Sequence, residues 1–317
     1  KSKLQTLATE PEECFDSAAA NTRSLSCQTW LGLSRDIRLF SIGEKLEWVQ
    51  PRFHGDEVPL PENGNQPCRY KFLMGRGWGP VSRITRRLED GVLPILHGVL
   101  VDEDITYNLT AFVTLETSAR TAQNLRGTHF LVADGYGHGH MFTPEQQARH
   151  DSLLAAEMNQ PEETVLFMRI KALNNPAAPR YAYFRNPAPG PADDFSFATV
   201  APYTFDGAEG LGVYEPGRVF AVSTLDGKPL SEEQAAVELL PGQSTVLEIR
   251  LFHRPVSRER ALKLREASFD QRHAECRAFW QYKLGSAARI SLPERRIDEM
   301  VRAGLLHLDL ITYGLEP

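Results

Sequence analysis

The sequence has few cysteines, and none of them is arranged for metal or redox chemistry. Four occur among 317 residues: Cys14, Cys27, Cys68 and Cys276. None forms a CxxC pair, which argues against a zinc ribbon or a thioredoxin-type dithiol. We favour free, structural thiols, because cysteine packs well as a small hydrophobe. A disulfide between Cys14 and Cys27 stays open, since four cysteines allow three connectivities and the spacing does not choose among them.

Long apolar runs, an excess of basic residues and internal repeats are also missing. The longest apolar run, residues 91–101, is too short to span a bilayer and contains Pro94 and His97. The net charge is -6 and the pI is near 5.9, so no basic stripe is available for a phosphate backbone. We therefore expect no nucleic-acid partner and no membrane partner. The absence of a visible repeat argues against propellers and solenoids. A secretory signal is either absent or already removed, so the sequence assigns no compartment.

Short β-branched and aromatic runs, separated by Gly, Pro, Asn and Asp, dominate residues 25–255. This texture is typical of a large antiparallel β-sandwich, a mainly β fold. The segment 105–116 (ITYNLTAFVTLE) alternates almost strictly, so one face of that strand is predicted to be buried. Further strands are predicted over residues 69–74, 81–88, 164–173, 181–185, 218–223 and 245–253. The proline-rich stretch 174–191 is predicted to be a surface excursion.

One helix is predicted to interrupt the sandwich, as an insertion or a crossover, over residues 143–158. Thr143 is its expected N-cap, Pro144 takes the first helical position, and Gln146 completes a capping box.

Two more helices are predicted near the C-terminus, over residues 257–284 and 293–313, the second beginning at Pro293 and ending at Gly314. In the second, apolar residues recur at spacings of three and four: Ile297, Met300, Val301, Leu305, Leu308 and Ile311. Leu306 and Leu310 widen this apolar face beyond what a helix lying in solvent needs. Such a face requires helical neighbours. We therefore expect the chain to be the front part of a larger protein.

The order of these elements resembles the N-terminal half of a six-hairpin glycosidase. The resemblance consists of a large β-sandwich, a last strand within LPGQSTVLEIRLFHRP, a helix carrying AFWQYKL, and SLPERRIDEMVRAGLLHLDL at the start of a helical array. Its specific part is confined to residues 240–310, where the best-matching positions are Trp280, Leu284, Pro293, Ile297, Met300 and Leu305. In that superfamily, and in the related two-domain disaccharide phosphorylases, a galactose-mutarotase-like supersandwich precedes helical linkers and an (α/α) barrel that holds the active site.

The resemblance implies a supersandwich over residues 1–255, a helical linker over 256–292 and the start of a truncated (α/α) barrel over 293–317. It implies the non-catalytic part of a glycoside hydrolase that acts on an oligo- or polysaccharide. This part would support the barrel and lend a loop to its substrate pocket. The implied partners are a carbohydrate and the barrel of the same protein. No cofactor is implied, and phosphorolysis is not distinguished from hydrolysis.

No catalytic residue is assigned in this chain, because the resemblance places the acid and the base in the barrel. Glu294, Asp298 and Glu299 lie on the first turn of a helix and are interpreted as capping and solvated charges. The chain alone is thus expected to be inactive. The alternative is a stand-alone carbohydrate-binding or assembly module whose C-terminal helices dock onto a partner or onto a second copy in a homodimer.

The most unusual local sequence is DGYGHGH, residues 134–140, which contains Tyr136, His138 and His140. His138 and His140, with Glu145, satisfy the HxHx4E spacing of a cupin metal site. Thr143 and Pro144 place Glu145 on a helix instead of a strand, and no second motif with a third histidine appears, so we expect no metal. An ordinary surface loop is favoured over a glycine-rich loop that reaches a sugar or a neighbouring segment.

A second glycine-rich segment, MGRGWGP over residues 74–80, holds Arg76 and Trp78. If exposed, Trp78 stacks on a pyranose ring while Arg76 donates hydrogen bonds to hydroxyl groups. Burial of Trp78 as a packing anchor is favoured, because tryptophan is highly buried on average. The candidate substrate-binding residues are thus Arg76, Trp78, Tyr136, His138 and His140. Mutarotase activity requires a histidine acid and a glutamate base in a cleft, and no recognisable spacing for them occurs.

Overall fold

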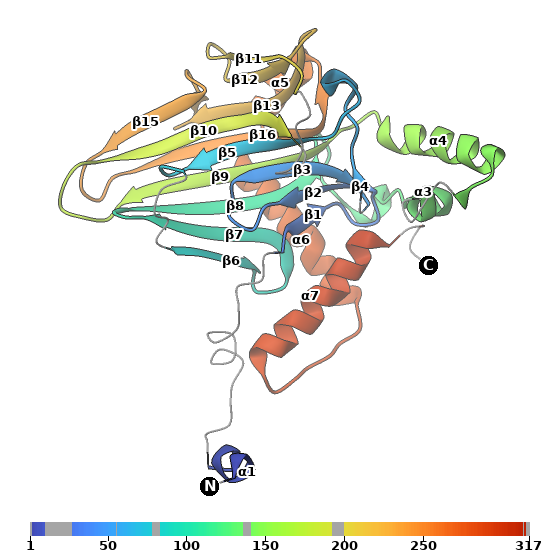
Figure 1. Cartoon of the computed structure of the whole chain (residues 1–317), viewed down its shortest axis with the longest axis horizontal. Coiled ribbons are helices and arrows are strands. Elements are labelled where there is room, and N and C mark those ends of the chain that lie inside the picture. Colours follow the sequence, from blue (N-terminus) through green and yellow to red (C-terminus); the bar gives the residue numbers. More distant parts are fainter. Residues whose placement is uncertain are drawn as a thin grey trace.

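Two antiparallel sheets stack face to face in the computed structural model (Figure 1). The structure describes residues 2–9, 27–54, 56–77, 83–135, 141–191, 200–312 and 314. The seven-stranded sheet runs β1-β2-β3-β5-β10-β15, with β4 paired to β3. Its strands are β1 (Thr29–Gly32), β2 (Arg38–Ile42), β3 (Trp48–Phe53), β4 (Asp56–Glu57), β5 (Cys68–Met74), β10 (Arg180–Pro191) and β15 (Gln234–Leu239). The predicted mainly β fold with large antiparallel sheets is confirmed.

The nine-stranded sheet runs β11-β12-β13-β16-β9-β8-β7-β6, with β14 paired to β13. Its strands are β6 (Arg83–Glu89), β7 (Leu93–Asp102), β8 (Ile105–Leu115), β9 (Thr164–Asn174), β11 (Tyr203–Asp206), β12 (Leu211–Tyr214), β13 (Arg218–Leu225), β14 (Lys228–Pro229) and β16 (Ser244–Val256). The helices are α1 (Lys3–Leu7), α3 (Phe130–Gly135), α4 (Pro144–Met158), α5 (Arg258–Arg265), α6 (Phe269–Ser286) and α7 (Arg295–Ile311), with short 3-10 turns η1 (Pro61–Asn63) and η2 (Ala122–Asn124).

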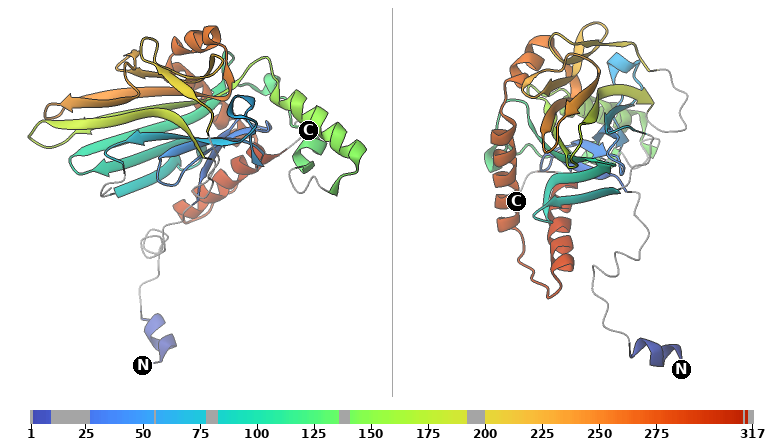
Figure 2. Two further views of the ribbon diagram at one scale, coloured as in Figure 1. Left: turned by 45° about the horizontal axis from the view of Figure 1, so that its top comes forward. Right: turned by 90° about the vertical axis from the view of Figure 1, so that its left-hand side faces the viewer.

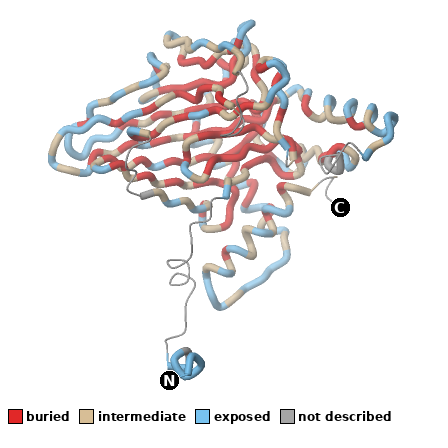
Figure 3. The backbone as a smooth tube through the Cα atoms, in the orientation of Figure 1, coloured by how far each residue is buried: buried red, intermediate tan, exposed pale blue. Residues whose placement is uncertain are grey.

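The main hydrophobic core lies between the two sheets (Figure 3). Tyr70 of the seven-stranded sheet stacks on Phe220 of the nine-stranded sheet, with ring centroids 5.2 Å apart. The core also encloses a histidine. His253 on β16 is fully buried, its Nε2 donates to the Arg52 carbonyl oxygen at 2.8 Å, and its ring meets Phe40 edge-on at 5.4 Å. The ring is therefore a neutral bridge between the sheets.

A second core forms on the outer face of the nine-stranded sheet, where α5, α6 and α7 pack (Figure 2). Phe112 of β8 stacks on Phe167 of β9, with ring centroids 5.5 Å apart. Phe269, the first residue of α6, meets these two rings edge-on at 5.0 and 6.4 Å. Trp280 is 1% exposed in the same cluster. The helices are thus fixed to the sheet by aromatic packing.

The burial pattern of β9 shows where this helical layer ends. Residues 164–168 are all buried, because one face packs in the inter-sheet core and the other under the helices. From Arg169 onward the pattern alternates, and Lys171 is exposed. The change from a continuous apolar run to alternation therefore marks the edge of the helical cover.

Strands are found in all the predicted segments, although residues 81–82 lie outside the described ones. The predicted helix over 143–158 is confirmed as α4, and Thr143 Oγ1 accepts from the Gln146 N–H at 3.3 Å in the expected capping box. The predicted surface excursion over 174–191 is wrong. Most of it is β10, an interior strand between β5 and β15. A register shift between Arg185 and Ala188 surrounds Pro187, which has no N–H to donate to a ladder.

The single helix predicted over 257–284 is also wrong, because the segment divides into α5 and α6. Ser268 lies between them in an extended conformation, and its side chain accepts from the Gln271 N–H at 3.3 Å. Such a serine cap begins a new helix. The break lets α5 pack near β13 while α6 crosses β7 and β8.

A buried ion pair anchors α7 to the rest of the structure. Asp309 accepts a hydrogen bond from Ser34 Oγ at 2.5 Å and pairs with Lys283 Nζ of α6 at 2.9 Å. The side chains of Lys283 and Asp309 are 6% and 14% exposed. The end of α7 is held as well, since His54 Nε2 donates to the Ile311 carbonyl oxygen at 3.2 Å. Removal of Asp309 leaves a buried lysine without this carboxylate.

We predict that Asp309→Ala lowers the free energy of unfolding by about 3 kcal/mol, because breaking a buried pair leaves an uncompensated charge. Urea denaturation of the 317-residue chain measures this change. The matched control is Glu259→Ala, which breaks the exposed Glu259–Lys263 pair and is expected to cost less than about 0.5 kcal/mol. Equal effects of the two substitutions would contradict the anchoring role of Asp309.

The buried histidine generates a pH prediction. Burial lowers the pKa of His253 to about 3, whereas the unfolded chain binds this proton near pH ~6.5. The neutral, buried His253 therefore contributes fully to the free energy of unfolding above that pH. As the pH falls towards 3, the unfolded chain binds the proton and the folded chain does not, so the free energy of unfolding drops by up to about 1.4 kcal/mol per pH unit. His253→Gln is less stable at pH 7, and its deficit relative to the natural chain shrinks between pH 6.5 and 4. A deficit that stays constant in urea titrations across this range argues against a neutral buried ring.

Candidate functional site

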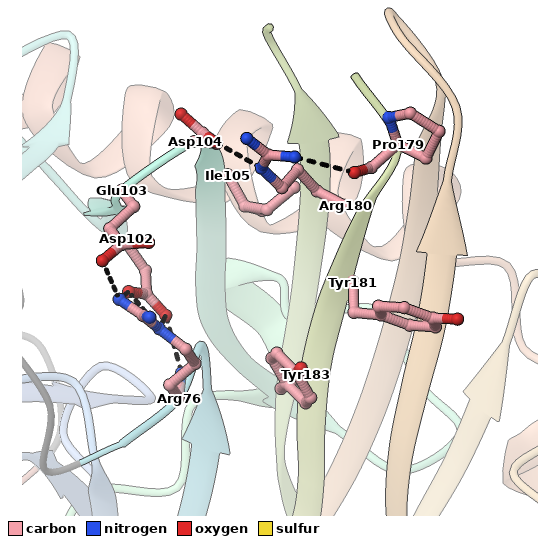
Figure 4. A pocket seen from close by; sticks show the side chains of 9 residues that line it. All are labelled: Arg76, Asp102, Glu103, Asp104, Ile105, Pro179, Arg180, Tyr181 and Tyr183. Atoms are coloured by element: carbon pink, nitrogen blue, oxygen red, sulfur yellow. Dashed lines mark hydrogen bonds and ion pairs between the residues drawn. The ribbon is translucent and has the colours of Figure 1, made fainter.

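A pocket of about 310 Å³ lies where the turn between β7 and β8 meets the start of β10 (Figure 4). This end of the sandwich is the one that the helical layer leaves uncovered (Figure 1). The pocket combines charged groups with two aromatic rings. It is lined by Arg76, Asp102, Glu103, Asp104, Ile105, Pro179, Arg180, Tyr181 and Tyr183.

A two-residue turn brings three carboxylates to the pocket. Asp102 and Ile105 are paired in the β7–β8 ladder, so Glu103 and Asp104 form the turn between them. Glu103 has a φ of 52°, in the left-handed region that tight hairpin turns require. The side chains of Glu103 and Asp104 thereby project beyond the strand ends, 61% and 36% exposed.

Arg76 is held rigidly by Asp102. The Asp102 carboxylate accepts from the Arg76 backbone N–H at 2.7 Å, from its Nη2 at 2.9 Å and from its Nε at 3.1 Å. Arg76 Nη2 also pairs with Glu103 at 2.9 Å. The hydrogen bonds to Asp102, and then to Glu103, raise the pKa of Arg76 above its ordinary value. Because Asp102 is only 6% exposed while Arg76 is 39% exposed, the carboxylate positions the guanidinium and the guanidinium faces solvent.

The aromatic part of the pocket comes from one strand. Tyr181 and Tyr183 lie on β10 and are 52% and 36% exposed, while Ala182 and Phe184 between and after them are buried. The Tyr183 backbone is bonded on both sides: its N–H donates to the Tyr107 hydroxyl at 3.0 Å, and its carbonyl oxygen accepts from the Gly75 N–H at 2.9 Å. Burial raises the pKa of Tyr107 to about 12, so Tyr107 is a neutral support.

A second ion pair closes the other side of the pocket. Arg180 Nε donates to Asp104, and Arg180 Nη1 donates to the Pro179 carbonyl oxygen at 3.0 Å. All three carboxylates of the pocket are therefore engaged by arginines. Glycoside hydrolysis needs a carboxylic acid that donates a proton and a second carboxylate on the other side of the bond. The pocket instead supplies hydrogen-bond donors, acceptors and exposed rings, which suits binding.

Arg76 is the one predicted site residue that belongs to the described part of the chain, and it lines this pocket. Trp78, Tyr136, His138 and His140 lie outside the described residues. Our prediction did not include Tyr181 or Tyr183. The alternation in RYAYF, residues 180–184, carries the signal, because it places both tyrosines on the face opposite Ala182 and Phe184.

The structure also separates two apolar faces of α7. Leu306 and Leu310 pack against the sandwich and are 2% and 4% exposed. Ile297, Met300 and Leu308 are 44%, 58% and 58% exposed. Residues at positions 297, 300, 304 and 308 follow helical spacing on one face, and the buried leucines lie on the opposite face. Ile297, Met300 and Leu308 of the predicted stripe thus form an outward face, which we name the outer face of α7, whereas Ile311 packs against the helical core.

The interpretation of Glu299 as a solvated charge is wrong, because its carboxylate is buried in ion pairs. Glu299 is 7% exposed and accepts from Arg87 Nη2 on β6 at 2.9 and 3.0 Å. It also accepts from Arg295 Nε at 2.9 Å. The pair with Arg87 fastens the start of α7 to the edge strand of the sheet.

Two of the described cysteines are buried and pack as small hydrophobes. Cys68 and Cys276 are buried free thiols, and burial raises their pKa values to about 11 and about 12, which makes them unreactive. Cys27 is free and exposed, and Cys14 lies outside the described residues. Within the described part of the chain, no group of three or more His, Cys, Asp or Glu side chains is placed to hold a metal. None of the described helices is long and apolar enough to cross a membrane.

Comparison with known proteins adds little to this geometry. No protein-family model and no curated protein matches the sequence. Among solved structures, the GH31 alpha-xylosidase from Xanthomonas citri is similar over 75% of this chain, with 12% sequence identity and a TM-score of 0.18. This chain covers 30% of the length of that enzyme. A TM-score of 0.18 does not establish a shared fold.

The arrangement of Gly75 generates a prediction. Gly75 has a φ of 85°, and a Cβ added there lies 2.9 Å from the Asp102 Oδ2 that holds Arg76. Gly242 has a φ of 73° with nothing within 4 Å of an added Cβ. Gly242→Ala is thus expected to cost about 1 kcal/mol from backbone strain alone.

Gly75→Ala adds displacement of Asp102 to the same strain, so we expect its loss of unfolding free energy to exceed that of Gly242→Ala by about 1 kcal/mol or more. Urea denaturation of both variants checks this difference. Equal losses of unfolding free energy would show that Asp102 moves away without cost and that its hydrogen bonds do not hold Arg76 rigidly.

Proposed function

We propose that this chain is the non-catalytic β-sandwich part of a glycoside hydrolase, and that it supports a helical catalytic domain of the same protein. The observation that carries the proposal is the outer face of α7. A helix that served only to cover the sandwich would turn its largest apolar stripe inward. Here Leu306, Leu310 and, in part, Ile311 pack inward, while Ile297, Met300 and Leu308 stay exposed.

The shape of the outer face suits an α-helix as its occupant. From Ile297 to Leu308 it extends about 16 Å along the axis, which is three turns of helix. Gly304 lies at its centre, and an added Cβ there meets nothing within 4 Å. A glycine between Met300 and Leu308 lets a second helix approach closely while the two flanking side chains fill its grooves. The proposed barrel supplies such helices.

The same proposal divides the chain into a sandwich over residues 1–255, a helical connection over 256–292 and, from 293, the first helix of the supported domain. The helical hairpin α3–α4 lies beside the C-terminal end of α7 (Figure 1), where the Gly314 N–H donates to the Thr128 carbonyl oxygen at 2.8 Å. This hairpin is the part of the sandwich that we propose reaches the neighbouring domain. The pocket around Arg76 lies at the opposite end.

A stand-alone carbohydrate-binding module is the second candidate, and one observation favours it. Leu306 and Leu310 pack back on the sandwich and Asp309 is bound to Lys283 and Ser34, so α7 is an integral part of this fold. In this alternative the outer face of α7 contacts a second copy of the chain.

Expression of the whole reading frame from the source gene, beside the 317-residue chain, tests the two candidates. The leading proposal predicts cleavage of glycosidic bonds by the longer protein and none by the 317-residue chain.

A substitution on the outer face of α7 tests the contact with the helical domain. We expect Leu308→Lys to change the free energy of unfolding of the 317-residue chain by less than about 0.5 kcal/mol, because the substituted side chain is exposed. In the longer protein the same substitution lowers activity and thermal stability, because it buries a lysine against the helical domain.

The control is Lys228→Ala, an exposed substitution on β14. A reading frame that ends at Pro317, cleavage by the 317-residue chain itself, or a longer protein indifferent to Leu308→Lys would each contradict the leading proposal. A frame that ends at Pro317, together with a dimer that Leu308→Lys dissociates in sedimentation equilibrium, would support the stand-alone module.

A further inference from the structure

We infer that Tyr181 and Tyr183 are two successive stacking positions for a neutral oligosaccharide chain that runs along β10. The inference rests on the carbohydrate-related role proposed above and names the ligand class for the pocket. It is carried by the spacing of the two rings, by the open surface beside them and by the pairing of the pocket charges.

The spacing of the rings matches a chain of sugars. Tyr181 and Tyr183 are two residues apart on the same face of β10, which places them about 7 Å apart along the strand. That separation is comparable with the length of one sugar residue in a chain. Both rings lie at the pocket, beside Arg180 and Arg76 (Figure 4). Adjacent pyranose rings therefore each meet one tyrosine face, and a single sugar meets only one.

The surface beside the two rings leaves room for a chain. In the β10–β15 ladder, Tyr183 lies opposite Ala236 and Tyr181 opposite Glu238. Ala236 is exposed and small, so it does not block the face of the sheet next to Tyr183. Arg185 follows on the same face and pairs with Glu233 at 3.4 Å. Polar groups thus continue along β10 beyond the pocket. A site for a single sugar does not need polar groups over that length.

The platform is already formed without a ligand. Tyr183 is fixed through its backbone to Tyr107 and Gly75, and Tyr107 meets Phe184 edge-on at 5.8 Å in the core. Arg76 is fixed by Asp102. Pre-formed partners reduce the entropy that binding has to overcome.

The charges of the pocket argue for a neutral ligand. Two arginines face three carboxylates, which leaves one net negative charge. Arg76 is bound to Asp102 and Glu103, and Arg180 to Asp104. A uronate or phosphate group would have to displace these carboxylates or lie next to them, and like charges repel. Hydroxyl groups accept from the arginines and donate to the carboxylates without disturbing either pair.

Titration calorimetry on the 317-residue chain tests the inference with xylohexaose, cellohexaose and mannohexaose, each beside its monosaccharide, and with hexagalacturonate. We expect at least one neutral hexaose to bind at least tenfold more tightly than its monosaccharide. Tyr181→Ala and Tyr183→Ala each weaken that binding by roughly tenfold, from the loss of one stacking face. The matched control is Tyr282→Ala, which removes a tyrosine that is 56% exposed on α6 and leaves binding unchanged.

Several results would overturn the inference: no binding of any neutral hexaose, equal affinity for a hexaose and its monosaccharide, tightest binding of hexagalacturonate, or a Tyr282→Ala effect as large as those on β10. Circular dichroism confirms that each variant is folded before titration. None of these results bears on the outer face of α7, whose test uses Leu308→Lys. Failure of the saccharide inference and failure of the supporting role are therefore distinguishable.

Discussion

One end of the nine-stranded sheet is buried on both faces, and this two-sided burial determines where the helices pack. There, Phe112 and Phe167 are stacked under α6, while Leu166 and Met168 of the same sheet face the opposite core. A sheet that is apolar on both faces requires a third layer, because exposed phenylalanines would otherwise remain in water. The third layer is α5–α7. Its position leaves the opposite end of the sandwich uncovered (Figure 2). Arg76, Tyr181 and Tyr183 line the pocket at that end.

The helix-covered end of the sandwich and the open end with the pocket lie far apart. Ile105, at the pocket, and Leu115, at the covered end of the sheet, are the two ends of β8, about 33 Å apart at the usual rise of a strand. A saccharide held by Tyr181 and Tyr183 would lie roughly that far from the covered end of the sandwich. In the proposed arrangement, the pocket would hold a polymer at a distance from the catalytic domain, and the α3–α4 hairpin would contact that domain.

Much of the fold was predictable from local patterns. Strict alternation identified β8, and the capping box of Thr143 and Gln146 identified α4, because both depend on neighbours in sequence. The prolines of β10 misled the prediction, since their tolerance depends on a bulge that only the pairing with β5 reveals. The break at Ser268 depends on how α6 meets Phe112. In the site, Arg76 was identified from its glycine-rich segment. Its hydrogen bonds to Asp102 could not be predicted, because the two residues are 26 apart in sequence.

Protection of Met300 from oxidation in the product of the whole reading frame would show whether a further domain covers α7. Hydroxyl-radical labelling compares this methionine, 58% exposed on the outer face of α7, with Met141, which is 77% exposed. We expect Met300 to be oxidised readily in the 317-residue chain and to be protected in the complete product, while Met168 in the core resists oxidation in both. Equal oxidation of Met300 in the two proteins would show that no domain covers α7 and would contradict the proposed supporting role.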